Sequence, residues 1–429
     1  MRKLDFSESF LHYIWQNQLY SFNDIYTIEG ESIEVVRPGI LNHDAGPDFS
    51  NAKIKIGDKI WVGNVEIHKN STDWFHHNHH LDKAYNNVIL HVVYQCDIKD
   101  KSERKNFLPT LELSNRISPS LVDNYANLAN SLDEIPCINQ LQKVKSIYIT
   151  NMLYKVGVLR IQNKTEELKE LFAFTNNSFE ETLYLILAKA FGGKLNGDAF
   201  VRLCKSIPKK QLMKFGNDSF KLEALLFGFA GLIPEHHIED YPVALQKEYV
   251  FQSKKIKLNR SANILWKFSR MRPSSFPTIR ISQFCNLLVS NTSLSNEIFA
   301  AQSVHELKSF LKCTASSFWE THYTFSNESK KLVKTLGDQS MNTIIINAIV
   351  PFLFFYGQQE NYPEQKEKAL KFLEQLEAEK NRVTRKWNNW GVPFHSAFET
   401  QAVLSLEKNY CSKKKCTSCY IGHQILSSK

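Results

Sequence analysis

The sequence lacks a hydrophobic segment long enough to cross a membrane. Its longest apolar run, Ile344 to Tyr356, contains Asn347 and Pro351 and is shorter than the roughly 20 residues that a spanning helix needs. Residues 1–5 lead directly into a polar stretch, without the apolar region of a signal peptide. We therefore expect a cytoplasmic protein that has no membrane partner.

The sequence also lacks the cysteine pattern of a disulfide-rich secreted domain. Its eight cysteines are spread over 429 residues. Cys96, Cys204 and Cys285 lie in apolar or mixed segments, where a thiol packs as a small hydrophobic group. With 43% hydrophobic and 23% charged residues, the chain is globular rather than disordered, and its length allows two or three domains.

One long segment has no acidic residue. Positions 249 to 296 contain no Asp or Glu, although the chain has 44 of them and a net charge of +9. Phe251, Trp266, Phe268 and Phe276 alternate there with lysine and arginine. Rings that stack on bases and cations that contact phosphates are typical of nucleic-acid binding. We predict nucleic-acid contacts from Lys254, Lys255, Lys257, Arg270, Arg272 and Arg280.

An alternative interpretation of this segment remains open. The aromatic residues could belong to a core, and the cations could pair with acidic helices such as Glu364 to Glu379. The stretch from Ser269 to Pro277 favours the binding interpretation, because its serine and proline residues are typical of an exposed loop.

Histidine and carboxylate side chains are concentrated in the segment from 43 to 91. It holds seven of the fourteen histidines of the chain, together with Asp48, Glu66, Asp73 and Asp82. Imidazole and carboxylate are the groups that metal-assisted hydrolysis uses. The run from His76 to His80 is either a transition-metal ligand group or a polar lid. His91 stands between Leu90 and Val92, which favours a histidine of the core.

Alternating apolar residues on both sides of Gly57-Asp58 predict a β-hairpin. Glu66 and His68 are two residues apart, so both side chains leave one face of their strand. Asp48 reaches that face only in some registers. A two-residue turn sets Asp48 opposite Ile67 and sends its carboxylate to the other face, whereas a three-residue loop or a bulge sets it opposite His68.

Pro47-Asp48 and Glu66-Ile67-His68 resemble the signature elements of the PD-(D/E)XK nuclease superfamily. The resemblance implies a core of helix, three strands, helix and strand, with Mg²⁺ or Mn²⁺ bound by Asp48 and Glu66. The helical pattern from Ser7 to Leu19 is the expected first helix, and Glu8 is a possible further acidic group. His68 stands where the superfamily usually has lysine, and it would orient or deprotonate water.

Several stretches resemble an uncharacterised bacterial family, domain of unknown function 2851. They are Gly46 to Phe49, Gly63 to His68, Asp73-Trp74, Asn86 to His91, Ile135 to Cys137, Ala224 to Gly228 and Cys411 to Gly422. This resemblance covers nearly the whole chain and implies a cytoplasmic bacterial protein. It carries no established activity, so the function has to be argued from the residues.

The pattern changes from mixed strands and helices to long helices near residue 135. We expect an α+β protein with a nuclease-like α/β domain at 1–135 and a mainly helical, basic domain at 136–429. The expected long helices are Val144 to Phe174, Ser178 to Phe191 with a stop at Gly192-Gly193, Lys221 to Phe229 and Pro363 to Trp387.

A cysteine cluster near the C-terminus is the sharpest local signal. Cys411, Cys416 and Cys419 are separated by four and two residues and stand among lysines, which favour the thiolate form. A fourth ligand is needed, and Cys137 and His423 are the candidates. Zn²⁺ fits either fourth ligand, whereas an iron–sulfur cluster fits four thiolates. We expect this site to hold residues 411–423 against the helical domain.

Three functions remain open at the level of the sequence. The carboxylate pair favours a metal-dependent nuclease or related phosphodiesterase. A non-catalytic nucleic-acid-binding or scaffold protein with a nuclease-like core is the second, and His68 in place of lysine is compatible with it. The third is a zinc hydrolase that uses His68 with the histidines at 76 to 80.

Overall fold

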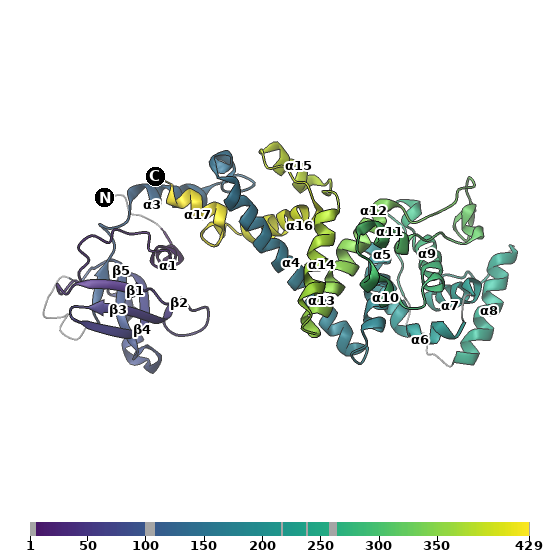
Figure 1. Cartoon of the computed structure of the whole chain (residues 1–429), viewed down its shortest axis with the longest axis horizontal. Coiled ribbons are helices and arrows are strands. Elements are labelled where there is room, and N and C mark those ends of the chain that lie inside the picture. Colours follow the sequence, from purple (N-terminus) through teal and green to yellow (C-terminus); the bar gives the residue numbers. More distant parts are fainter. Residues whose placement is uncertain (1–5, 99–107, 216–217, 237–238, 257–263, 429) are drawn as a thin grey trace. The chain divides into compact units, whose positions relative to one another are not determined.

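The computed structural model describes residues 6–98, 108–215, 218–236, 239–256 and 264–428. The described chain is α+β and forms two compact units. Unit 1 comprises residues 1–152 and 406–429, and unit 2 comprises residues 153–405. The last 24 residues therefore return to the unit that contains the N-terminus, and Figure 1 shows α17 beside α3. The boundary expected at 135 differs, because residues 136–152 and 406–429 belong to unit 1.

Unit 1 is built on a six-stranded sheet whose strands run in the order β1-β3-β4-β5-β6, with β2 paired to β3 (Figure 1). β1, β3 and β4 are antiparallel neighbours, whereas β5 is parallel to β4 and β6 is parallel to β5. The elements before α3 are α1 (Glu8–Gln16), β1 (Ile33–Arg37), β2 (Ile40–Leu41), β3 (Phe49–Ile56), β4 (Lys59–Asn70), α2 (Asp73–His76), η1 (His79–Leu81), η2 (Lys83–Tyr85), β5 (Val88–Gln95) and β6 (Thr110–Glu112).

The helix α1 packs against β4 through an apolar stripe. Phe10, Leu11, Ile14 and Trp15 are fully buried on this stripe, at the spacing that the sequence predicts. Ser7 precedes the helix but makes no side-chain capping bond. Its hydroxyl lies 2.6 Å from that of Ser9 and 3.0 Å from that of Tyr125.

A β-bulge divides the β3–β4 hairpin into two registers. Near the turn the strands pair as far as Ala52 with Gly63, whereas Phe49 pairs with Val65, so β3 has one extra residue between these pairs. Asn51 lies in the bulge with φ +56°, a left-handed conformation that asparagine tolerates better than most residues. The bulge moves every residue before Asn51 to the opposite face from that set by the turn.

The rest of unit 1 contains helices from both ends of the chain. They are α3 (Pro119–Asn130), η3 (Ile138–Lys143), the start of α4 (Ser146–Phe174), η8 (Glu407–Cys411), η9 (Cys416–Ser418) and α17 (Tyr420–Ser427). The Asn124 side chain donates to the carbonyls of Ile425 and Ser428, and the Lys145 N–H donates to Gln424 Oε1. The C-terminal helix is therefore bound to the end of the α/β part.

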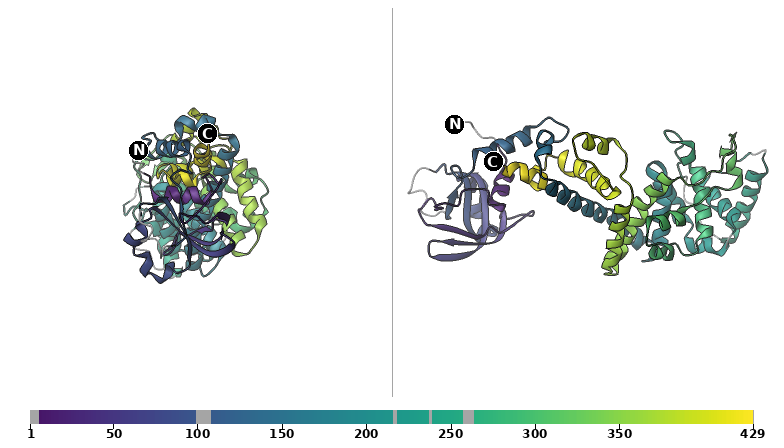
Figure 2. Two further views of the ribbon diagram at one scale, coloured as in Figure 1. Left: turned by 90° about the vertical axis from the view of Figure 1, so that its left-hand side faces the viewer. Right: turned by 45° about the horizontal axis from the view of Figure 1, so that its top comes forward.

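Unit 2 is mainly helical, with one short two-stranded sheet (Figure 2). Its elements after α4 are α5 (Phe179–Ser206), α6 (Lys209–Leu212), η4 (Met213–Phe215), α7 (Ser219–Ala230), α8 (Asp240–Ile256), η5 (Pro273–Ser275), α9 (Pro277–Ser290), α10 (Leu294–Ala300), α11 (Val304–Leu311), η6 (Ser317–Glu320), β7 (His322–Thr324), β8 (Asn327–Glu328), α12 (Asp338–Ile344), η7 (Ile345–Ile349), α13 (Val350–Gln359), α14 (Pro363–Gln375), α15 (Arg382–Asn389) and α16 (Ala397–Leu406).

Two of the expected helices of unit 2 are interrupted in the structure. α5 is broken at Gly193, whose φ +59° and ψ −159° are not helical, so the stop expected at Gly192-Gly193 is confirmed and a second helical stretch follows it directly. The expected helix from 363 to 387 is two helices, α14 and α15. The apolar run at 344–356 lies within Asp338–Gln359. Among the described residues this is the one helical stretch that is long and apolar enough to span a membrane, and 72% of its most apolar part is buried inside the protein.

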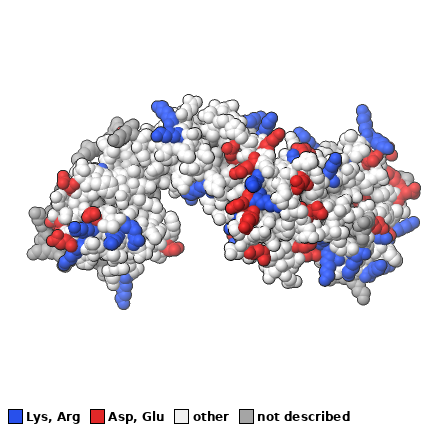
Figure 3. Space-filling model, in the orientation of Figure 1, with Lys and Arg blue, Asp and Glu red and all other residues white. Residues whose placement is uncertain are grey.

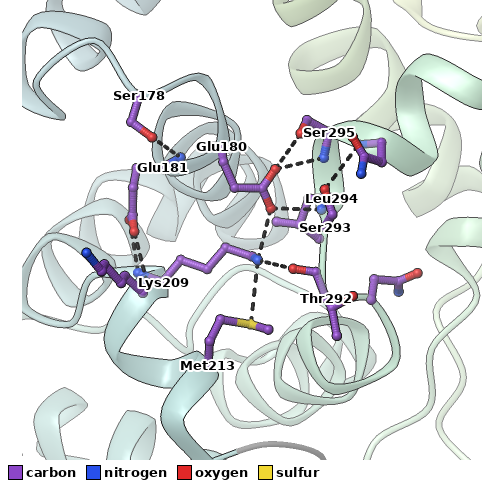
Figure 4. A network of polar contacts seen from close by, with 12 residues as sticks. Ser178, Glu180, Glu181, Lys209, Met213, Thr292, Ser293, Leu294 and Ser295 are labelled. Atoms are coloured by element: carbon purple, nitrogen blue, oxygen red, sulfur yellow. Dashed lines mark hydrogen bonds and ion pairs between the residues drawn. The ribbon is translucent and has the colours of Figure 1, made fainter.

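The first turn of α5 joins three helices of unit 2 (Figure 4). Glu180 accepts hydrogen bonds from the N–H groups of Leu294 and Ser295, at the start of α10, while Glu181 accepts from the N–H of Lys209, at the start of α6. The buried Lys209 ammonium lies 2.9 Å from Glu180 Oε1. Carboxylates at helix N-termini satisfy otherwise free N–H groups, so this contact orders the core of unit 2.

Candidate functional site

Asp48 and Glu66 lie side by side because of the bulge in β3. The Asp48 N–H donates to Glu66 Oε2 over 3.0 Å, and the Ile67 N–H donates to Asp48 Oδ2 over 3.0 Å. His12, on α1, places Nε2 3.2 Å from Asp48 Oδ2. The two carboxylates that the sequence predicts as metal ligands are thus together.

Glu66 is buried and Asp48 is partly buried, with little positive charge to balance them. Glu66 is 5% exposed, and its pKa is raised to about 8 by burial and by the charge of Asp48, with a smaller contribution from Glu8. The pKa of Tyr85 is raised to about 12 by burial and by the charges of Glu66 and Asp48. A cation bound between these oxygens would relieve the repulsion.

Three histidines complete the group around Glu66. Glu66 Oε1 lies 3.2 Å from His79 Nε2 and 3.6 Å from His68 Nε2. His68 Nε2 also lies 3.1 Å from His77 Nδ1. One ring nitrogen from each of His68, His77 and His79 lies within 4.8 Å of the other two. The segment around α2 and η1 therefore folds back over β4 and adds imidazole to the carboxylate pair.

His91 holds the ring of His68 in place through a hydrogen bond between the two imidazoles. His68 Nδ1 lies 2.9 Å from His91 Nε2, and both rings are almost fully buried. The pKa of His68 is lowered to about 3 by burial and by His91, His77 and His79, and burial lowers that of His91 to about 4. Both imidazoles are therefore neutral at physiological pH, which is the form that binds metals.

The donor atoms of this site suit a transition metal. Mg²⁺ prefers oxygen ligands, whereas neutral imidazole binds zinc, iron or nickel well. The ring nitrogens of His68, His77 and His79 are close enough to converge on one ion, and Glu66 Oε1 lies beside those of His68 and His79. In the described part of the chain, one other group of this kind exists, formed by Glu239, His322 and Glu328 of unit 2, with Glu328 exposed.

The predicted nucleic-acid-binding residues divide into three groups. Lys254, Lys255, Arg270 and Arg272 are exposed in unit 2, and Figure 3 shows lysine and arginine gathered at the end of unit 2 that carries α6 and α8. Lys257 lies outside the described residues. Arg280 is 9% exposed and donates to Ser340 Oγ over 2.7 Å and to Gln283 Oε1 over 3.1 Å. The prediction for Arg280 is wrong, because these buried bonds give it a structural role.

The aromatic residues of the same segment divide between the core interpretation and the binding interpretation. Phe251 is 63% exposed, whereas Trp266 and Phe276 pack against the core of unit 2. Trp266 Nε1 also donates to the carbonyl of Ala230 over 2.9 Å. The core interpretation is therefore correct for Trp266 and Phe276, and Phe251 remains free to stack on a base.

The four cysteines that the sequence singles out come together in unit 1. Cys411, Cys416 and Cys419 surround η9, and Cys137 precedes η3. The pKa of Cys137 is raised to about 12 by burial and by the thiols of Cys419 and Cys416. That of Cys411 is raised further, by burial and by the other three thiols, and that of Cys416 is raised to about 12 by burial and by Cys419.

The His423 ring contacts α1. Its Nδ1 lies 2.7 Å from the hydroxyl of Tyr13, and the backbone N–H of His423 donates to the Cys419 carbonyl over 2.7 Å. Of the two candidates for a fourth ligand, Cys137 is therefore the one placed with the cysteines. Residues 411–423 belong to unit 1 together with Cys137, which the sequence placed at the start of the expected helical domain.

Sequence reasoning did not single out His12 and gave little weight to His77 and His79. His12 is one helical turn beyond Glu8, on the same face of α1. This spacing from a possible acidic ligand is the feature of the sequence that could have identified His12. Adjacent histidines in a short irregular segment have no fixed period, so their direction depends on the fold of 73–85.

Comparison with known proteins gives a family but no further relatives. No curated protein and no solved structure matches the chain. The family model "Protein of unknown function (DUF2851)" matches residues 8–382. This match includes the carboxylates, the histidines and Cys137, and it ends before the three C-terminal cysteines. The chain belongs to the DUF2851 family of proteins of unknown function.

Proposed function

We propose that unit 1 is a metal-dependent nuclease or related phosphodiesterase. The observation that carries the proposal is the convergence of Asp48, Glu66 and His68 on one face of the β3–β4 hairpin. The bulge at Asn51 produces this arrangement against the register of the turn. Bulges next to active sites commonly redirect a side chain in this way.

The order of the elements supports the same proposal. α1, β1, β3 and β4 are followed by short helices and then by β5, which is parallel to β4. This is the order of helix, three strands, helix and strand that the PD-(D/E)XK resemblance implies, with β2 and β6 as additions. Asp48 directly precedes the second strand of that order, and Glu66 lies in the third.

The residues would divide the work between metal binding and proton transfer. Glu66, Asp48, His77 and His79 would hold a divalent ion, which supplies positive charge to a phosphate oxygen and lowers the pKa of water. In the tautomer that donates Nδ1–H to His91, His68 presents a lone pair on Nε2. Because its pKa is lowered to about 3, His68 is a weak base, and it would serve as a further ligand or orient the water, in the place of the usual lysine.

The substrate class follows from the exposed cations of unit 2. Lys254, Lys255, Arg270 and Arg272 suit a polyanion, and Phe251 is available for stacking on a base. A protein that only binds nucleic acid would have the same surface. Catalysis therefore has to be tested at the carboxylates rather than at the cations.

A zinc hydrolase acting on another substrate is a second candidate. The observation in its favour is the approach of the ring nitrogens of His68, His77 and His79 to within 4.8 Å of one another. Its metal would depend on the histidines, and Asp48 would contribute little.

The test is cleavage of labelled DNA and RNA strands with Mg²⁺, Mn²⁺ or Zn²⁺, and with chelator. The variant Asp48→Asn should lose cleavage, whereas Asp44→Asn, which changes an exposed carboxylate four residues earlier, should retain it. Absence of cleavage by the wild-type protein with every metal, despite binding of the strands, would leave the non-catalytic alternative. Hydrolysis of a carboxylic ester but of no phosphodiester would favour the zinc hydrolase.

A further inference from the structure

Four thiols from two distant parts of the sequence gather at one place in unit 1. Cys137 and Cys419 are 7% and 8% exposed, and Cys411 and Cys416 are partly buried. Each of the six pairs among the four is close enough for the thiols to influence each other electrostatically. None of them forms a disulfide. Such a group is costly as four ionised thiolates unless a metal compensates their charge.

The surrounding chain is shaped to hold the loop of 411–419 closed. Lys414, with φ +49°, donates through Nζ to the carbonyl of Ala129 over 2.9 Å. Gly422 allows α17 to approach η9, because a Cβ at this position would lie 2.1 Å from the Cys416 carbonyl oxygen. These contacts fix the loop from both sides, so the positions of the thiols are set by the fold.

The spacing of the sulfur atoms distinguishes between two kinds of site. A single zinc ion with Zn–S bonds of about 2.3 Å holds its sulfurs about 3.8 Å apart. In the described chain, every group of three or more ligand atoms within 4.8 Å of one another consists of histidine or of histidine and glutamate, without cysteine. The four thiols are therefore spread more widely than around one ion. A multinuclear cluster spaces its cysteines more widely, because they bind different metal atoms.

We infer that Cys137, Cys411, Cys416 and Cys419 bind an iron–sulfur cluster. Four thiolates are the usual ligand set of such clusters, and the lysines at 413–415 place positive charge beside the anionic centre. The cluster would link the segment before η3 to the C-terminal segment. It is distinct from the carboxylate and histidine site, and the inference does not depend on the activity proposed above.

The experiment is metal and sulfide analysis of the full chain, expressed with added iron and purified without oxygen. We expect iron and acid-labile sulfide in about equal amounts, with broad visible absorbance that bleaches on reduction. Cys137→Ser and Cys416→Ser should each lose most of the iron. The matched control is Cys96→Ser in the same unit, where the thiol lies near Ser71, and this variant should keep the iron.

Three results would overturn the inference. The first is about one zinc per chain without sulfide, which indicates a tetrahedral site. The second is a wild-type protein without metal whose four thiols react freely with a thiol reagent in the folded state. The third is equal loss of iron in the Cys96→Ser control. The first two results are measured on the wild-type protein. They therefore decide the question even if the variants fail to fold.

Discussion

At the scale of single residues, buried ionisable groups divide into those with a structural role and those that suggest chemistry. Glu223 of unit 2 is 1% exposed and accepts hydrogen bonds from Ser282, Tyr241 and Ser316. Its neighbours are neutral donors. Glu66 lacks such a set of hydroxyl donors and faces histidines and a second carboxylate instead. The difference in partners is the reason to assign structure to one and metal binding to the other.

Glu223 predicts a pH dependence of stability. Burial raises its pKa above the ordinary value of 4.5, and the three hydroxyl bonds oppose this only in part. As the pH rises past about 4.5, the unfolded chain releases this proton before the folded one. The contribution of Glu223 to stability is therefore present below that pH and is lost as the pH rises to the folded-state pKa.

Denaturation of the wild type and of Glu223→Gln at a series of pH values tests this prediction. The difference in stability between them should shift in favour of the glutamine variant as the pH rises from 4.5. A difference that is constant over the whole range would show that the Glu223 pKa is not raised by folding.

At the scale of elements, the bulge of β3 decides whether the candidate site exists. Asn51 holds φ +56°, which costs a β-branched residue about 1–2 kcal/mol. We predict that Asn51→Val destabilises unit 1 and weakens metal binding, because it favours the regular register in which Asp48 leaves the face of Glu66.

The matched substitution is Asn51→Gly, which accepts the same backbone conformation without strain and should retain metal affinity. Calorimetric titration of both variants with Mn²⁺ or Zn²⁺ makes the comparison. Equal metal affinity in the valine and glycine variants would show that metal binding does not depend on the bulge.

The sequence predicts the elements of unit 1 better than their pairing. The hairpin expected around Gly57-Asp58 is present as β3 and β4, because alternation of apolar residues is a local property of the sequence. The bulge could be named only as one possibility, since it depends on packing of both strands.

Arg280 looked like its exposed neighbours in composition, and only the fold of α9 buried it. The convergence of the cysteines required contacts across more than 270 residues, which no local pattern contains.

At the scale of the whole molecule, the chain combines a mixed α/β unit with a helical unit that carries exposed cations. Both α1 and α17 belong to unit 1, and the exposed cations predicted to contact nucleic acid belong to unit 2. In the function proposed above, unit 1 cleaves the substrate and unit 2 binds the polyanion. These tasks are testable independently.

Binding should depend on Arg270 and Arg272. Replacing both with glutamine should weaken binding to a single-stranded oligonucleotide. The slope of log affinity against log salt should become shallower by about 1.4, since each phosphate contact on a single strand contributes about 0.7. Arg382 and Arg385 of α15, which are also exposed, form the control pair with the same change of charge. Equal slopes for both double variants would show that net charge alone, and not the segment at 249–296, controls binding.

The central claim is that Glu66 belongs to a metal centre that cleaves phosphodiester bonds. The most direct measurement is the rate of oligonucleotide cleavage as a function of metal concentration, for the wild type and for Glu66→Gln. We predict a saturable rate for the wild type and a loss of about 100-fold or more in the variant at every concentration. Superimposable curves for the two proteins, or no cleavage by the wild type with Mg²⁺, Mn²⁺ or Zn²⁺, would contradict the claim.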